Sequence, residues 1–135
     1  MRFDASTETF GWLAAPDEKQ RQIRKEYRHI DKQFRAVLTE ALASRGYVEA
    51  DPGPPDVWLE YWFGRRVTGN PDQPAIDKHY AMITLDVLEP DGLKLAWRTS
   101  AEVLVDRSAS AADIRDLMRR TVDAMLESIP PRATN

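Results

Sequence analysis

The sequence predicts an α+β fold, a two-layer sandwich in which two helices lie on one face of a four-stranded mixed sheet. Three observations lead to this prediction. Residues 81–105 alternate apolar and polar side chains on either side of an EPDG turn, as a β-hairpin does. Residues 17–46 and 110–129 instead space their apolar side chains by three and four, as helices with one buried face do. The predicted element order is β-α-β-β-β-α.

Length and composition narrow the class of protein. A chain of 135 residues fits one domain, 1–135, that buries roughly two thirds of the surface its unfolded chain exposes. The chain has no cysteine, which excludes disulfides, thiolate catalysis and cysteine-based zinc sites. Its net charge of -3 gives no general attraction to nucleic acid, so we expect no nucleic-acid partner.

The N-terminal part predicts a short strand followed by a long helix. Residues 7–13 (TETFGWL) are β-prone, with Phe10 and Trp12 on one side. Asp17 and Gln20 fit a capping box, in which the Gln20 side chain reaches back to the helix start. Gly46 fits the left-handed position that ends a helix. The apolar stripe of this helix is Ile23, Tyr27, Ile30, Phe34, Val37, Leu38, Ala41 and Leu42.

Residues 56–63 (DVWLEYWF) predict the second strand, with large apolar groups on both faces. Residues 47–55 before it are rich in proline and glycine and predict a linker. Residues 64–79 after it have no period, two glycines and two prolines, and predict a long surface loop of a functional or mobile kind. If the first two strands are parallel, the helix between them is a right-handed crossover. One face of the second strand carries Val57, Leu59, Tyr61 and Phe63, and the other Trp58, Glu60 and Trp62.

The hairpin and a final helix complete the predicted fold. Ser110 and Asp113 fit a capping box at the start of this helix, and two prolines at 130–131 end it. We expect the hairpin to point Ile83, Leu85 and Val87 into the core before the turn, and Leu93, Leu95, Trp97, Ala101 and Val103 after it. The apolar stripe of the helix is Ile114, Leu117, Met118, Thr121, Val122, Met125, Leu126 and Ile129.

Five short motifs occur in a fixed order along the chain. They are T-F-x-W at 9–12 after Asp4, A-L-x-S-R-G-Y at 41–47, P-D-V-W-L-E-Y at 55–61, I-T-L-D-V-L-E-P-D-G-L-K-L-A-W-R at 83–98, and I-P-P at 129–131. Through these motifs nearly the whole chain resembles the DUF4136 family, domains of unknown function found mostly in bacterial envelope lipoproteins. The resemblance implies an envelope location and transfers no catalytic residue, because the family has none established. The chain departs from the family in two ways: it has no lipobox cysteine, and it has Thr99 where relatives tend to have glycine.

Trp58, Glu60 and Trp62 predict a binding surface. If the other face of their strand meets the helices, these three lie on the open face of the sheet, near Arg98 of the hairpin. Clustered exposed aromatic side chains usually mark a partner, so this face predicts a homodimer interface, another protein partner or a shallow ligand platform. The alternative is a flipped strand with the tryptophans in the core, or loops folded over them. Two arginines of the following segment, Arg65 and Arg66, are grouped with this surface.

A basic ridge is predicted along the solvent side of the first helix. At about 100° per residue, its cations fall opposite the apolar stripe. They form either an ordinary solvated face or a contact with anionic head groups, polysaccharide or an acidic partner. The ridge consists of Arg21, Arg24, Lys25, Arg28, Lys32 and Arg35.

Signals of catalysis are weak. Asp77 and His79 with a remote carboxylate could hold a metal, but such loose spacing is common, and we predict no metal and no cofactor. His29 fits a solvated helix position. A nucleophile elbow, a phosphate-binding loop and an HExxH motif are missing from the sequence, so we expect no enzyme.

The leading functional hypothesis is a non-enzymatic binding or structural module of the bacterial cell envelope, acting through the open sheet face and the 64–79 segment. A small-ligand carrier with tryptophan stacking walls is the alternative, and an uncharacterised hydrolase the third. No stretch reaches the length of a transmembrane segment. We expect a periplasmic or outer-membrane-associated protein if the chain is a trimmed precursor, and a cytoplasmic one as written.

Overall fold

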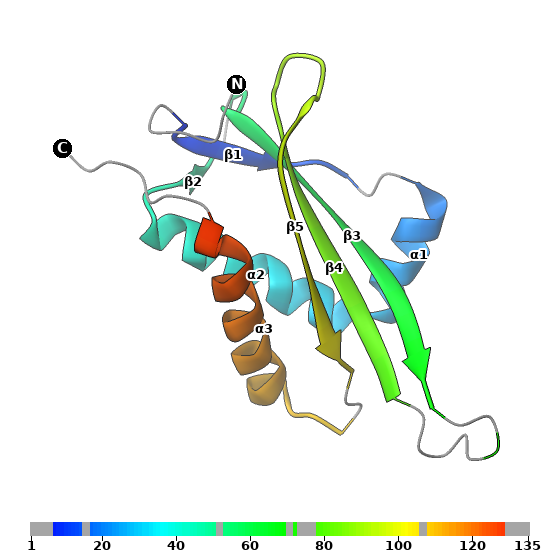
Figure 1. The fold of residues 1–135 in the computed structure, drawn as a ribbon. Helices are drawn as coiled ribbons and strands as arrows, with labels where there is room; N and C mark the ends of the chain where they lie inside the picture. The colour runs from blue at the N-terminus through cyan, green and yellow to red at the C-terminus, as the bar shows by residue number, and fades with distance from the viewer. Residues whose placement is uncertain are drawn as a thin grey trace.

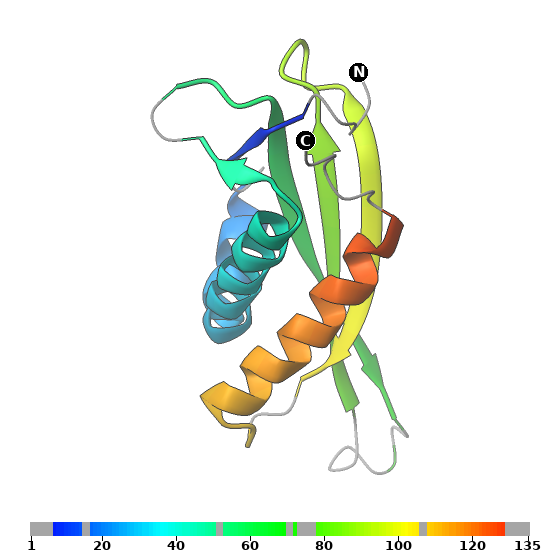
Figure 2. The same cartoon turned by 90° about the vertical axis from the view of Figure 1, so that its left-hand side faces the viewer.

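The computed structural model describes residues 7–14, 17–50, 53–69, 72, 78–105 and 108–128. Three helices lie on one side of a five-stranded mixed sheet, as Figures 1 and 2 show. The helices are α1 (Glu18–Glu26), α2 (Arg28–Ser44) and α3 (Ala111–Met125), with a short 3-10 turn after α3 (Leu126–Ser128). The strands are β1 (Thr9–Trp12), β2 (Val48–Glu49), β3 (Val57–Thr68), β4 (Lys78–Leu88) and β5 (Leu95–Leu104). The predicted α+β class is confirmed, with one more strand and one more helix than expected.

The strand order is β2-β1-β3-β4-β5. β1 pairs in parallel with β2 and β3, while β3, β4 and β5 form an antiparallel meander. The meander is as predicted, and the parallel pairing of β1 with β3 meets the condition stated above for a crossover between them. The additional strand, β2, lies in the segment predicted as a linker, and its two residues are too few to give a periodic signal in the sequence.

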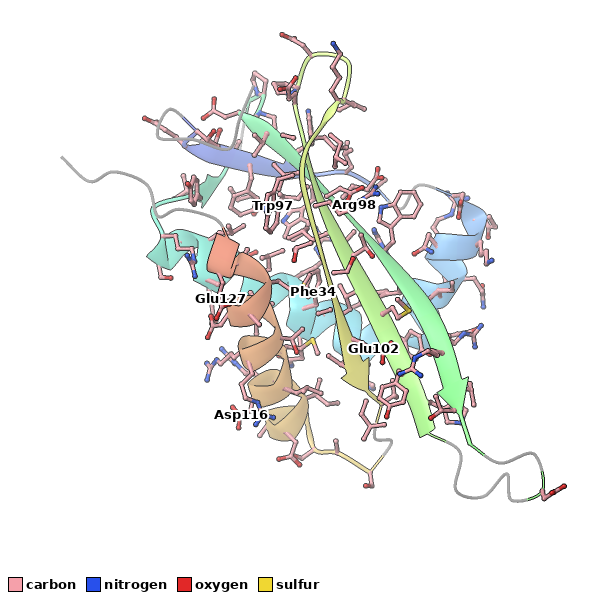
Figure 3. The ribbon with its side chains drawn as sticks, in the orientation of Figure 1. Phe34, Trp97, Arg98, Glu102, Asp116 and Glu127 are labelled. Atoms are coloured by element: carbon pink, nitrogen blue, oxygen red, sulfur yellow. The ribbon has the colours of Figure 1, made fainter. Side chains whose placement is uncertain are left out.

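The core lies between the sheet and the helices. The predicted face of β3, Val57, Leu59, Tyr61 and Phe63, is buried, each residue exposing 1%. From the helix side, Phe34 of α2 exposes 0% and packs against Tyr61 and Phe63, with ring centroids 5.2 and 6.4 Å away. Figure 3 shows Phe34 between the helices and the strands. The predicted strand orientation is therefore confirmed, and the alternative with both tryptophans in the core is wrong.

The predicted helix over 17–46 is interrupted at Tyr27, where the backbone (φ -105°, ψ 32°) leaves helical geometry. α1 and α2 therefore run in different directions (Figure 1). At the far end Gly46 has φ 94°, and the Gly46 and Tyr47 N–H groups donate to the carbonyls of Ala43 and Leu42 at 3.0 and 2.9 Å. These bonds form a Schellman motif, and the left-handed helix end predicted for this glycine is confirmed.

α1 protects an edge of β3. β1 pairs only with Val57 to Leu59 of β3, so the following residues of that edge have no strand neighbour. The Gln20 side chain takes this place: its Nε2 donates to the Phe63 carbonyl at 3.0 Å, and its Oε1 accepts from the Phe63 N–H at 2.9 Å. The predicted capping box is thus half right, because the Asp17 side chain accepts from the Gln20 N–H as expected while the Gln20 side chain turns to the sheet.

The hairpin contains a register irregularity. Val87 pairs with Trp97, but Leu88 pairs with Leu95, so Ala96 is an extra residue and inverts the alternation on β5. The expectation that Leu93 and Leu95 point into the core is therefore wrong: they expose 47% and 50%. The remaining hairpin residues predicted to face the core do so.

α3 begins at the capping box predicted for Ser110 and Asp113, in which each side chain accepts from the other's N–H. Met118, Val122 and Met125 of its stripe are buried. Ile129 and the two prolines expected to end the helix lie outside the described residues.

Candidate functional site

The candidate site lies on the sheet face opposite the helices, which we call the outer face. Its side chains come from alternate residues of three neighbouring strands, and no described helix covers them. In the middle row, Glu60 of β3 pairs with Asp86 of β4, and Asp86 pairs with Arg98 of β5. Along β3, Trp58 lies on one side of this charged row and Trp62 on the other, so the two indoles flank the charged row.

Asp86 anchors the middle row. Its side chain is 4% exposed although it lies on the outer face, because neighbouring side chains cover it. Arg98 donates to both carboxylate oxygens, from Nε at 2.6 Å and from Nη2 at 2.9 Å, and Trp62 Nε1 lies 3.4 Å from Oδ2. This bidentate pair fixes the guanidinium of Arg98 and raises its pKa, chiefly through the hydrogen bond to Asp86. Arg98 itself stays 55% exposed.

Glu60 differs from the other charged residues of this face. Within the described part of the chain its carboxylate has no hydrogen-bond or ion-pair partner, although it lies directly opposite Asp86. Partial burial raises the pKa of Glu60, the neighbouring Asp86 charge raises it further, and Arg24 lowers it. Since Arg98 neutralises Asp86, the middle row carries one uncompensated negative charge, between two tryptophans.

This arrangement predicts that Glu60→Gln stabilises the protein at neutral pH. A carboxyl whose folded pKa is raised above its unfolded value contributes stability below the unfolded pKa and loses it as pH rises through the folded pKa. Removing that charge should therefore raise the free energy of unfolding by less than about 1 kcal/mol at about pH 7, with no gain at about pH 3. Urea unfolding of both proteins at the two pH values measures this. Equal gains at both values would contradict the electrostatic cause.

The tryptophans are partly buried rather than fully exposed. The Trp58 ring lies over Gly11 of β1 so closely that a Cβ added there would be 2.9 Å from a ring carbon. Further along the outer face, Arg66 forms an ion pair with Glu102 and stacks over the Tyr80 ring at 4.5 Å. The outer face is thus built from positioned aromatic and charged side chains along its length.

The predicted 64–79 loop is shorter than expected. β3 continues through Thr68 and β4 begins at Lys78. The sequence did not indicate these strand ends, because polar side chains on the open face of a long hairpin weaken the hydrophobic pattern. Residues 70–71 and 73–77 lie outside the described residues. Arg65 and Arg66 are neighbours within β3 and so lie on opposite faces. Grouping Arg65 with the outer face is wrong, since it pairs with Glu26 of α1 at 2.9 Å.

One member of the basic ridge also lies elsewhere. Arg24, expected on the solvent side, packs over the Tyr61 ring at 3.8 Å and donates from Nη2 to the Tyr61 carbonyl at 2.8 Å. It continues the protection of the β3 edge that Gln20 begins, since residues four apart share a helix face. Burial and the hydrogen bond to Asp31 raise the pKa of the Tyr61 hydroxyl. The other cations proposed for anionic contact, Arg21, Lys25, Arg28 and Lys32, are exposed.

A cavity lies on the helix side, where the first turns of α2 and α3 meet the ends of the strands. Its volume is about 1470 Å³, and neither Trp58 nor Trp62 lines it. His29 and His79 are both among its lining residues. In the described ranges no three histidine, aspartate or glutamate side chains gather as metal ligands would, and Asp77, the proposed partner of His79, lies outside them.

Sequence reasoning missed Asp86 and Gln20. Asp86 stands at a polar position of an alternating strand, and the only available signal was its register opposite Arg98. Gln20 resembled a capping residue, and nothing in the local sequence shows that a strand edge passes beside it. Both roles depend on which strands are neighbours, which is a property of the fold.

The described residues form a small α+β module in which helices cover one face of the sheet and leave the other face open. A family model described as "Domain of unknown function (DUF4136)" matches residues 2–131. The chain belongs to this family, as its motifs suggested. The comparison with curated proteins found no match.

Solved structures share the fold at low sequence identity. PelC from Paraburkholderia phytofirmans, solved as a dodecamer, aligns with a TM-score of 0.58 at 10% identity, over 96% of this chain and 91% of PelC. Lipoprotein GNA1162 from Neisseria meningitidis aligns with a TM-score of 0.52 at 10% identity, over 90% and 99%. A PDZ domain protein from Parabacteroides distasonis aligns with a TM-score of 0.55 at 11% identity, over 95% of this chain and 33% of that protein. Among the described residues, no helix is long and apolar enough to cross a bilayer.

Proposed function

We propose that this protein is a non-enzymatic binding module of the bacterial cell envelope, which engages a protein partner through the outer face. The observation that carries the proposal is the half-buried Glu60 carboxylate, which has no hydrogen-bond partner among the described residues and lies between Trp58 and Trp62. Leaving a partly desolvated charge unpaired costs stability, and a ligand that pairs with it removes that cost.

The chemistry of the face indicates what binds there. A carboxylate attracts a cation, and indole faces attract cations further through their quadrupoles. Arg98, held in place by Asp86, keeps half of its side chain in solvent and can receive a carbonyl or carboxylate oxygen of the same partner. The proposed partner segment therefore presents a lysine or arginine to Glu60 and an acceptor to Arg98, about two strand spacings away across Asp86.

The envelope location rests on the family and on the fold. The similarity to lipoprotein GNA1162 supports an envelope protein, as the resemblance to the DUF4136 family implies. PelC was solved as a dodecamer, which supports the broader idea that this chain also assembles with other protein chains. The exposed cations Arg21, Lys25, Arg28 and Lys32 remain a second candidate contact, for an anionic envelope surface.

A photo-crosslinking experiment tests the proposal. A photo-reactive amino acid replaces Met82, an outer-face residue that is 41% exposed, and in a matched variant it replaces Lys32 on the solvent side of α2. After irradiation of cells of the native host, we expect a discrete adduct in the envelope fraction from position 82 only. Adding Glu60→Lys should reduce that adduct at least about tenfold, because one lost charge-assisted contact costs about 1.5–3 kcal/mol.

Three outcomes would overturn the proposal. The first is the absence of an adduct at position 82, and the second is the same adducts at both positions. The third is an adduct that Glu60→Lys leaves unchanged. The small-ligand alternative predicts a different result, namely no protein adduct and a change of tryptophan fluorescence that saturates with added arginine amide.

A further inference from the structure

The edges of the sheet differ in how their free backbone groups are protected. At one end β2 is only two residues long. The edge of β3 beyond β1 is closed by side chains of α1, through Gln20 and Arg24. β5, at the other end, has ten residues and β4 as its only strand neighbour in the described structure. Long unprotected edges are rare in proteins, because their free backbone groups pair with any available strand.

The direction of the free backbone groups on β5 follows from the hairpin. The Val105 N–H donates to the His79 carbonyl at 2.8 Å, so Val105 directs its backbone groups toward β4. Because hydrogen-bonded residues alternate in an antiparallel pair, odd-numbered residues of β5 bond to β4 and even-numbered ones point outward. The outward groups therefore belong to Arg98, Ser100, Glu102 and Leu104, whose side chains lie on the outer face. In Figure 3, Trp97 and Arg98 project to opposite sides of β5.

We propose that β5 pairs with β5 of a second copy in antiparallel orientation, about a two-fold axis at Ser100, joining the two sheets into one. The charges of the edge select this partner and this register. With the axis at Ser100, Arg98 lies opposite Glu102 of the second copy, and Glu102 opposite Arg98 of the second copy. Opposite charges directly across an antiparallel pair stabilise it.

The neighbouring registers are poorer. An axis at Arg98 or at Glu102 sets two like charges opposite each other, which is unfavourable. An axis at Thr99 or at Ala101 sets a charged residue opposite Ser100. The Ser100 register also links two ion pairs that each copy already contains, Arg98–Asp86 and Arg66–Glu102. The side chains of Asp86, Arg98, Glu102 of the second copy and its Arg66 then alternate in charge across the joined sheet. This dimer uses the β5 edge and leaves Trp58, Glu60 and Trp62 open for the partner proposed above. Arg98 directs two of its five N–H donors to Asp86, so its other donors can contact both the second copy and that partner.

Disulfide trapping tests the register directly, because the chain has no cysteine of its own. In a hydrogen-bonded antiparallel pair, opposite Cα atoms are about 5.5 Å apart, which a disulfide spans. Ser100→Cys should therefore give an intermolecular disulfide under mild oxidation of the full chain. Thr84→Cys is the matched control: Thr84 lies beside Ser100 on the same face, with the hydroxyl oxygens 3.0 Å apart, but one strand further from the axis.

We expect Ser100→Cys to cross-link at least about tenfold faster than Thr84→Cys, and Glu102→Lys to slow the cross-linking of Ser100→Cys. Sedimentation equilibrium of the unmodified chain should show a dimer that Ser100→Pro dissociates, since proline removes an outward N–H and leaves the bonds to β4 intact. Equal cross-linking of the two cysteine variants, or a monomer at all concentrations, would overturn the proposal. Neither result affects the photo-crosslinking test at position 82.

Discussion

Phe34→Ala is expected to lower the free energy of unfolding by about 3–5 kcal/mol, the largest effect of a single substitution that we predict. Phe34 exposes 0% of its surface and packs against Tyr61 and Phe63, so its ring fills the space between α2 and β3. Alanine would leave a cavity between α2 and β3 that the surrounding core can close only in part. Chemical denaturation followed by circular dichroism measures the change.

Two further variants test whether the loss of stability comes from the cavity or from a general effect on α2. Phe34→Leu retains much of the volume and should cost about 1–2 kcal/mol. Lys32→Ala changes an exposed residue on the same helix and should stay within about 0.5 kcal/mol. If Phe34→Ala proved no worse than Phe34→Leu, the interface between α2 and β3 would be loosely packed, contrary to the burial described above.

The helical and strand periods predicted the layers well for a physical reason. A residue such as Phe34 or Leu59 must be buried wherever its element lies, so its position in the period already determines the face that it occupies. The same reasoning placed the tryptophans of β3 opposite the core. It failed at Leu95, because an extra residue at 96 inverts the alternation, and at Tyr27, because the direction change between two helices leaves the apolar spacing unbroken.

The candidate site was harder to predict because the pairing register of three strands brings its residues together. The sequence contains Glu60 and Arg98 as plausible surface charges, but it does not show that Asp86 lies between them. Arg24 was assigned to solvent for the same reason: a helix period says which residues share a face and not which strand edge lies opposite. Long-range pairing, rather than local propensity, decides these roles.

Gln20→Ala is expected to lower the free energy of unfolding by about 2–4 kcal/mol. The Gln20 side chain satisfies both the N–H and the carbonyl of Phe63 in a buried setting, so alanine leaves two backbone groups unpaired at once. Urea unfolding measures the loss. Gln22→Ala, an exposed position on α1, is the control and should stay within about 0.5 kcal/mol. Equal losses in the two variants would mean that the β3 edge does not depend on this side chain.

Gln20→Glu tests the same two bonds through pH. The ionised carboxylate still accepts from the Phe63 N–H, but it faces the Phe63 carbonyl without a proton to donate, and burial raises its folded pKa above the unfolded value of about 4.3. Stability of this variant is therefore present at low pH and lost as pH rises through the folded pKa. Below about pH 4 the protonated acid has one donor and one acceptor, like glutamine, so the variant should approach the unmodified protein. A deficit that stays constant with pH would contradict the paired bonds to Phe63, because only they distinguish the two protonation states.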